Sequence, residues 1–151
     1  MQTFLSFLFL LGLVVWLGSV IFFSFFAAPS IFKVLDRQQA GDVIGSIFPK
    51  YYAIGYTCAF LLAATAMTAP GGAAGLRLPF IAVMAACTFY AGLVINPQAR
   101  QVKQQLRETG GHNEELEGKF KSLHGWSVRL NATVLIFGLG LLWITAMGLK
   151  F

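Results

Sequence analysis

The sequence predicts an all-α integral membrane protein in which four transmembrane helices form an up-down bundle with short amphipathic extensions on the cytoplasmic side. Composition is the first observation behind this prediction. Of the 151 residues, 57% are apolar and only 11% are charged, whereas a typical soluble domain is about 25% charged. A soluble chain of this length would expose large apolar patches, which soluble monomers avoid. The length suits a single domain covering residues 1–151.

The second observation is a long apolar run at the start, which predicts a first span over residues 4–28. This run contains no charged side chain. At 1.5 Å per residue the helix would be about 37 Å long, more than the roughly 30 Å of a hydrocarbon core. A cleaved signal peptide is not expected, because no Lys or Arg precedes Lys33 and the apolar run is too long. Pro29 is expected to end the span.

A polar connector follows at residues 33–50. Its apolar residues recur at roughly helical spacing, which predicts a short amphipathic helix at the membrane surface that ends at Pro49. The second predicted span covers residues 52–67 and is the shortest of the four. The start of this span is rich in tyrosine, which suits an interfacial aromatic belt; the residues are Tyr51, Tyr52 and Tyr56.

The third predicted span covers residues 78–95, after a turn expected at residues 70–75, and it leaves the membrane at Asn96-Pro97. Apolar residues recur beyond this point, so the helix is expected to continue as an amphipathic extension. Asn113 is expected to cap a new helix. That helix would run on into the fourth span, over residues 123–149.

The positive charges indicate the orientation. The loops before the second and fourth spans carry eight basic residues, whereas the second loop and the C-terminus carry only Arg77 and Lys150. The positive-inside rule then places both termini outside the cytoplasm of the bacterial inner membrane. A nucleic-acid partner is not expected, because the basic residues do not form a stripe with interleaved aromatics. The eight residues are Lys33, Arg37, Lys50, Arg100, Lys103, Arg107, Lys119 and Lys121.

Polar residues gather at the cytoplasmic ends of the predicted spans. Ser127 and Asn131 are four residues apart, and His124 precedes Ser127 by three, so these side chains would share the inner face of one helix. They predict either a ligand-binding pocket or hydrogen bonds between helices, with Asn96 as a partner. Arg129 is about 200° around the helix from Ser127. It would either bind an anionic group or snorkel to the interface.

Soft ligands are also present, although they do not form a recognised metal motif. Cys58, Cys87 and Met84 lie in apolar segments and could bind Cu(I) or pack in the core. A bis-histidine haem site within one chain is not expected, because His112 falls in an aqueous loop and only His124 remains. Histidine pairs across a homodimer stay open. No catalytic constellation appears, so the chain is not expected to be an enzyme.

Several short motifs occur in order along nearly the whole chain. They are Trp16-Leu17-Gly18, Pro29-Ser30-Ile31-Phe32, Phe48-Pro49-Lys50-Tyr51-Tyr52, Asn96-Pro97, and Leu123-His124-Gly125-Trp126-Ser127 with Asn131. Together these motifs resemble the transmembrane protein 205-like family, whose bacterial members carry a domain of unknown function. The resemblance implies a four-helix membrane protein, and the association of a eukaryotic relative with platinum-drug resistance implies handling of soft metals or small molecules.

Three functions are compatible with these features. The first is transport or binding of a small solute or soft metal through the polar cluster in the cytoplasmic leaflet. The second is an accessory or assembly subunit of a larger membrane complex. The third is a redox protein that binds haem or another cofactor, although the sequence does not identify a cofactor. One chain leaves little room for a pore, so a homo-oligomer in the lipid bilayer is also compatible with the sequence.

Overall fold

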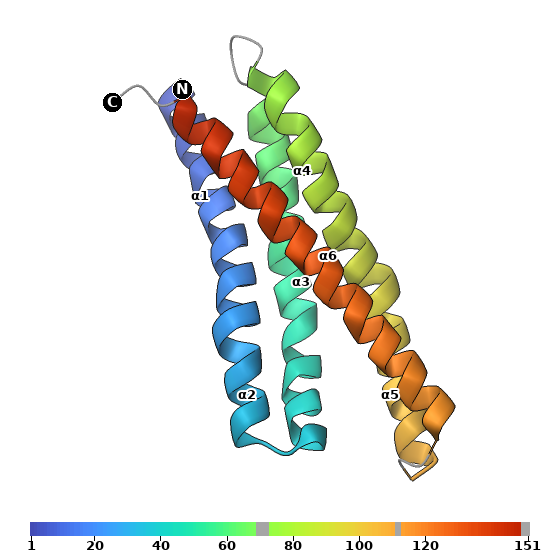
Figure 1. Cartoon of the computed structure of the whole chain (residues 1–151). Helices are drawn as coiled ribbons and strands as arrows, with labels where there is room; N and C mark the ends of the chain where they lie inside the picture. The colour runs from blue at the N-terminus through green and yellow to red at the C-terminus, as the bar shows by residue number, and fades with distance from the viewer. Residues whose placement is uncertain (69–72, 111–112, 149–151) are drawn as a thin grey trace.

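The computed structural model describes residues 1–68, 73–110 and 113–148, and these residues form helices joined by short links (Figure 1). Two of the long helices contain a π-helical turn, labelled η. The elements are α1 (Gln2–Ile21), η1 (Phe22–Ala27), α2 (Ala28–Val34), α3 (Arg37–Met67), α4 (Ala73–Tyr90), η2 (Ala91–Ile95), α5 (Asn96–Glu108) and α6 (Glu114–Met147). The all-α prediction is confirmed.

Three continuous helices among the described residues are long and apolar enough to cross a membrane. They are Gln2–Val34, Gly75–Glu108 and Glu114–Met147. The chain is therefore a multi-pass membrane protein. The span predicted at residues 52–67 is helical as part of α3, but α3 is not among these three helices.

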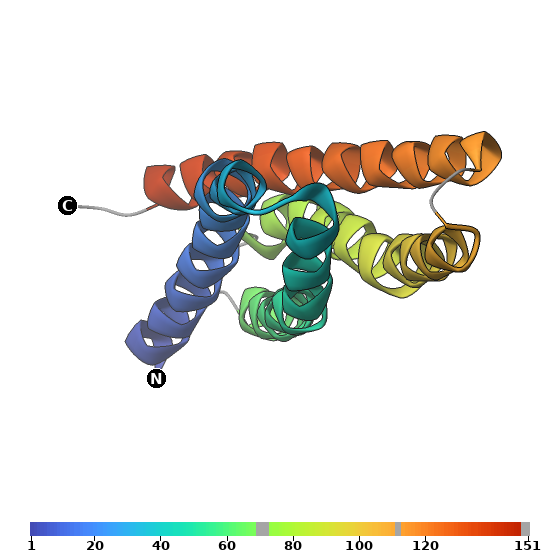
Figure 2. The same ribbon diagram turned by 90° about the horizontal axis from the view of Figure 1, so that it is seen from below.

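The long helices pack side by side in a closed order, in which α1 contacts α3, α3 contacts α4, α4 contacts α6 and α6 contacts α1. Seen from below, α6 runs along one edge of the bundle, and all the other helices lie to the same side of α6 (Figure 2). The start of α1 and the end of α6 lie at one end of the molecule (Figure 1). The α2–α3 link and the α5–α6 link lie at the other end.

Each long helix contributes at least one fully buried side chain to the core: Trp16 from α1, Leu62 from α3, Met84 from α4 and Leu141 from α6. Lipid is as apolar as these side chains, so close packing rather than the hydrophobic effect holds membrane helices together. Most large apolar side chains outside this core are exposed on the outer faces, where lipid would cover them.

The prediction that Pro49 ends a short surface helix is wrong, because α3 continues through Pro49 without a break. A proline inside a helix cannot donate to the carbonyl four residues earlier, which here is Gly45 O. Arg100 of α5 replaces that donor: its Nη2 lies 3.3 Å from Gly45 O. The contact partner that makes this possible is more than fifty residues away, so local sequence patterns could not reveal it.

Pro29 also fails to end its helix, since α2 runs on to Val34. A π-helical turn precedes this proline, and a second one precedes Pro97 in α5. The extra residue of a π turn widens the helix and relieves the clash of the proline ring with the preceding turn. The helix therefore continues past each proline.

The amphipathic extensions predicted around residues 98–121 are helical where the structure describes them, in α5 and the start of α6. Val102 of α5 and Leu123 of α6 are buried against each other's helices in a small core of their own. Asn113 caps α6 as expected, because its side chain accepts a hydrogen bond of 3.1 Å from Leu116 N. The helix then continues without interruption to Met147. Of the turn expected at residues 70–75, residues 70–72 lie outside the described residues, and the prediction is wrong for residues 73–75, which are the first turn of α4.

Small residues allow close contact between helices at particular crossings. A Cβ on Gly55 would lie 2.7 Å from Thr88 Cγ2, whereas a Cβ on Gly18 would have no neighbour within 4 Å. Thr88 is buried and β-branched, so it has little freedom to move away. The contact between α3 and α4 therefore requires glycine at position 55.

We predict that Gly55→Leu destabilises the folded protein in detergent by about 1–3 kcal/mol, because a larger side chain overpacks this crossing. The matched variant Gly18→Leu on the exposed face of α1 should retain or slightly raise stability, since glycine is a poor helix former. Thermal unfolding of both variants measures the difference. Equal stability of the two variants would show that the crossing does not constrain position 55.

Candidate functional site

A row of aromatic rings connects η1, α3 and α4. Phe23 of η1 lies 5.1 Å from Tyr51 of α3, measured between ring centroids. Tyr52 and Tyr56 stack along α3, and Tyr56 stacks on Phe89 of α4 at 4.5 Å. The tyrosines expected in an interfacial belt therefore face other helices, and Tyr51 and Tyr52 are buried.

Hydrogen bonds connect these tyrosines with α6 and η1. The hydroxyl of Tyr51 donates to Asn131 Oδ1 at 2.7 Å, and Asn131 Nδ2 donates to Ser24 Oγ at 3.3 Å. The hydroxyl of Tyr52 lies 3.5 Å from Ser127 Oγ. Ser127 and Asn131 therefore share an inner face and bond to neighbouring helices. Their partners are the tyrosines and Ser24, and not Asn96 as expected.

The other two candidate residues of α6 lie elsewhere. His124 is exposed, so it does not share the inner face predicted for it. Arg129 is also exposed, and its guanidinium lies 5.5 Å from the centre of the Trp126 ring. This cation–π contact holds Arg129 on the outer surface of α6, away from the hydrogen-bonded residues.

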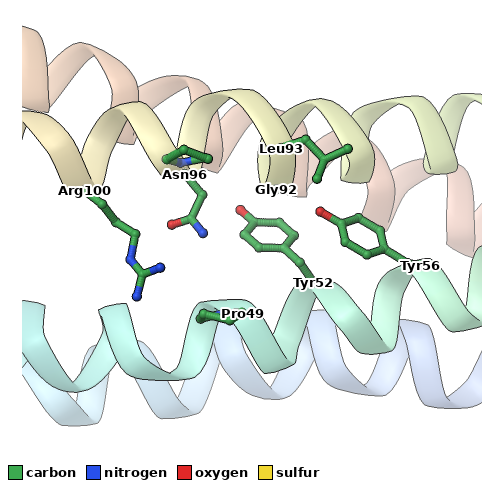
Figure 3. Close-up of a pocket in the computed structure, with 8 residues that line it drawn as sticks. Pro49, Tyr52, Tyr56, Gly92, Leu93, Asn96 and Arg100 are labelled. Atoms are coloured by element: carbon green, nitrogen blue, oxygen red, sulfur yellow. The ribbon is translucent and has the colours of Figure 1, made fainter.

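A groove of about 450 Å³ lies between α3 and the η2–α5 segment. Tyr52 and Tyr56 reach into it from α3, and Asn96 and Arg100 reach into it from the opposite side (Figure 3). Asn96, predicted as a site residue, therefore belongs to this groove. The full lining is Pro49, Tyr52, Tyr56, Gly92, Leu93, Asn96, Pro97 and Arg100.

Gly92 gives the two tyrosines access to the groove. A Cβ at this position would overlap Tyr56 Oη and would lie 2.8 Å from Tyr52 Cγ. A ring carbon next to the side-chain stem cannot move without the whole residue moving. Pro97 lies one turn further along this helix. It has no backbone N–H, so it cannot donate a hydrogen bond to a carbonyl of the preceding turn, at Gly92–Leu93.

An ion-pair network joins α3 to α5 next to the charged end of the groove. Lys103 Nζ lies 2.8 Å from Asp42 Oδ1, and Arg107 contacts the same oxygen. The hydrogen bond from Lys103, followed by that from Arg107, lowers the pKa of the Asp42 carboxyl below its ordinary value. These contacts join α3 to α5 beside Arg100, which is itself bonded to Gly45 O.

The soft ligands lie in the packed core. Cys58 and Met84 are buried, and Cys87 is partly buried against the same core. Within the described residues, no group of three or more His, Cys, Asp and Glu side chains could hold a metal ion. His112, considered above as a haem ligand, lies outside the described residues.

The sequence patterns did not single out Tyr52, Tyr56 or Arg100 as site residues. A signal was present, because Tyr52 and Tyr56 are four residues apart, as are Asn96 and Arg100. Each pair shares one helix face. What the pattern lacked was any indication that these two faces meet, since prolines in both helices predicted breaks between them.

We predict that Tyr51→Phe and Asn131→Ala are energetically coupled by about 0.6–1.7 kcal/mol, the range measured for hydrogen bonds between membrane helices. Each single variant removes the same bond, so the double variant should be more stable than the sum of the two effects implies. Unfolding of the four proteins in detergent measures the coupling. Strict additivity would show that the bond does not stabilise the bundle.

We also predict that Asp42→Asn destabilises the α3–α5 contact at pH 7, and that this effect shrinks progressively as the pH falls below the ordinary Asp pKa value of 3.8. The lowered pKa means that the carboxylate stabilises the fold above the unfolded-state value, and this contribution disappears as pH falls through the folded-state value. Thermal unfolding of wild type and variant across this pH range tests it. Glu115→Gln, at an exposed acidic residue of α6, is the control that should keep the wild-type profile.

Comparison of the sequence with known proteins identifies the family of this chain. No solved structure matches the chain. An uncharacterised protein of Aquifex aeolicus (strain VF5) is 54% identical over 46 residues, which are 30% of this chain and 33% of that protein. The chain thus matches about a third of that relative's length. The model of a domain of unknown function, DUF4149, matches residues 11–108, a range that includes every residue lining the groove. The chain therefore belongs to the DUF4149 family.

Proposed function

We propose that this DUF4149 protein binds a small solute in the groove between α3 and η2–α5. The groove itself carries the proposal. Its volume of about 450 Å³ falls within the usual range for ligand sites, about 300–1,000 Å³. Apolar walls with a few convergent polar groups are also typical of such sites. Here the polar groups are the two tyrosine hydroxyls, the Asn96 amide and the Arg100 guanidinium.

The proposal includes a membrane topology of four spans in an up-down bundle, with α3 as the fourth span. Tyrosine and small residues lower the hydropathy of α3, but many of these side chains are buried against α1 and α4. A span shielded in this way needs less apolar character than one that faces lipid. The basic residues then place the groove in the cytoplasmic leaflet of the bacterial inner membrane, with both termini outside the cytoplasm.

The side chains of the groove favour an organic or anionic solute over a soft metal. They offer oxygen and nitrogen atoms, whereas soft metals prefer sulfur. The hydrogen-bonded residues Ser127 and Asn131 support the groove from behind, through Tyr52 and Tyr51. Transport of the solute, and kinship with the transmembrane protein 205-like family, belong to the same proposal. The two π turns that precede Pro29 and Pro97 support transport, since π turns occur often at functional sites.

Native mass spectrometry of the protein, extracted gently from its own membranes, tests this function. The wild type should carry excess mass from a bound molecule. Leu93→Trp places a larger side chain at the exposed wall of the groove and should reduce the bound fraction about tenfold, equivalent to about 1.4 kcal/mol. Leu139→Trp, at a similarly exposed leucine of α6, is the control that should retain the ligand. A wild-type chain without bound mass would contradict the proposal.

A further inference from the structure

The groove opens toward the outer face of the bundle. In the close-up view, α3 and the η2–α5 segment lie in front and the other helices lie behind them (Figure 3). Leu93 lines the groove and is 63% exposed, and Phe89, which stacks on the groove residue Tyr56, is 41% exposed. In a bilayer these exposed apolar side chains would meet lipid. A ligand can therefore enter the groove sideways from the membrane.

The polarity of the groove differs between its two ends. Along η2–α5, Gly92 and Leu93 line the apolar end, and Asn96 and Arg100 line the charged end. Eight positions separate Gly92 from Arg100, which corresponds to about 12 Å of helix. A ligand that matches this gradient has a charged head and an extended apolar tail.

The charged end has capacity for an anion. Both ion pairs among the described residues use Asp42, which accepts from Lys103 and Arg107. Among the described residues, the guanidinium of Arg100 therefore has no carboxylate as an ion-pair partner. Its Nη2 donates to Gly45 O, which fixes the position of the guanidinium. An arginine has five N–H donors, so others remain for a phosphate group.

We propose that the ligand is an anionic glycerophospholipid, an inference that rests on the proposed function of the groove. Its phosphate binds the guanidinium of Arg100 and the amide of Asn96. One acyl chain lies along Leu93 and Tyr56 and leaves the groove toward the bilayer. A zwitterionic lipid carries a cationic group that would oppose Arg100, so the site discriminates by headgroup charge. A water-soluble phosphate lacks the chain that the apolar end would accommodate.

Lipid titration followed by native mass spectrometry tests this inference on the full-length protein after delipidation in detergent. The probes are dioleoyl phosphatidylglycerol and dioleoyl phosphatidylcholine, which share their acyl chains and differ in headgroup charge. Wild type should bind the first about tenfold more tightly than the second. Glycerol phosphate, which has the anionic head alone, should not compete at the same concentration.

Variants of one charged and one apolar residue then locate the site. Arg100→Gln should abolish the preference for the anionic lipid, and Arg100→Lys should retain part of it because the charge remains. Arg37→Gln, at an exposed arginine of α3, is the charge-matched control that should keep the preference. Leu93→Trp should weaken both lipids, because it occupies the chain position, and Leu139→Trp should weaken neither.

The outcomes separate this inference from the proposed function. Equal binding of the two lipids by wild type, or a preference that survives in Arg100→Gln, would overturn the phospholipid assignment. The proposed function would still stand if extraction from native membranes shows a different bound mass that Leu93→Trp removes. Loss of preference in Arg37→Gln as strong as in Arg100→Gln would show a general effect of surface charge and would also overturn the assignment.

Discussion

Proline removes a backbone donor from a helix, and within lipid the carbonyl left behind must find another partner. The half of the bundle that contains Pro29, Pro49 and Pro97 is arranged around that constraint. At Pro49 the missing donor is supplied by Arg100 of a different helix, whose Nη2 reaches Gly45 O. At Pro29 and Pro97 a π turn directly before the proline relieves the clash of its ring with the helix instead. Arg100 lies on α5 and donates a hydrogen bond to a backbone carbonyl of α3. This bond fixes the spacing of the two helices, and the groove between them follows from that spacing.

Two sets of polar side chains lie side by side and have different surroundings. Ser24, Tyr51 and Asn131 bond to one another within the bundle, so they are satisfied internally and hold α3, α6 and η1 together. Asn96, Arg100 and the Tyr56 hydroxyl face the groove on the outer side of α3. Tyr52 takes part in both sets, since it lines the groove and approaches Ser127 from behind. Packing of the helices and the shape of the proposed site are therefore coupled through one tyrosine.

Charge is distributed so that Arg100 differs from its neighbours. Asp42 pairs with both Lys103 and Arg107 across the α3–α5 contact, which ties the helices together. Arg100 instead bonds to a backbone carbonyl and lines the groove. Arg129, the charge inside the fourth predicted span, lies on the outer face of α6 against Trp126. The Trp126 ring supplies a cation–π contact to this exposed charge.

By itself the sequence determined the helical class, the membrane environment and the helical extensions around residues 98–121, because apolar runs, charge counts and the Asn113 cap act over short distances along the chain. It also indicated that Ser127 and Asn131 share an inner face, since helical periodicity is local. It could not show that α3 passes through Pro49, that the partners of Asn131 are Tyr51 and Ser24, or that His124 is exposed. Only the tertiary structure decided these points. Each depends on which faces of distant helices meet, as when Arg100 supplies the hydrogen bond that Pro49 cannot make.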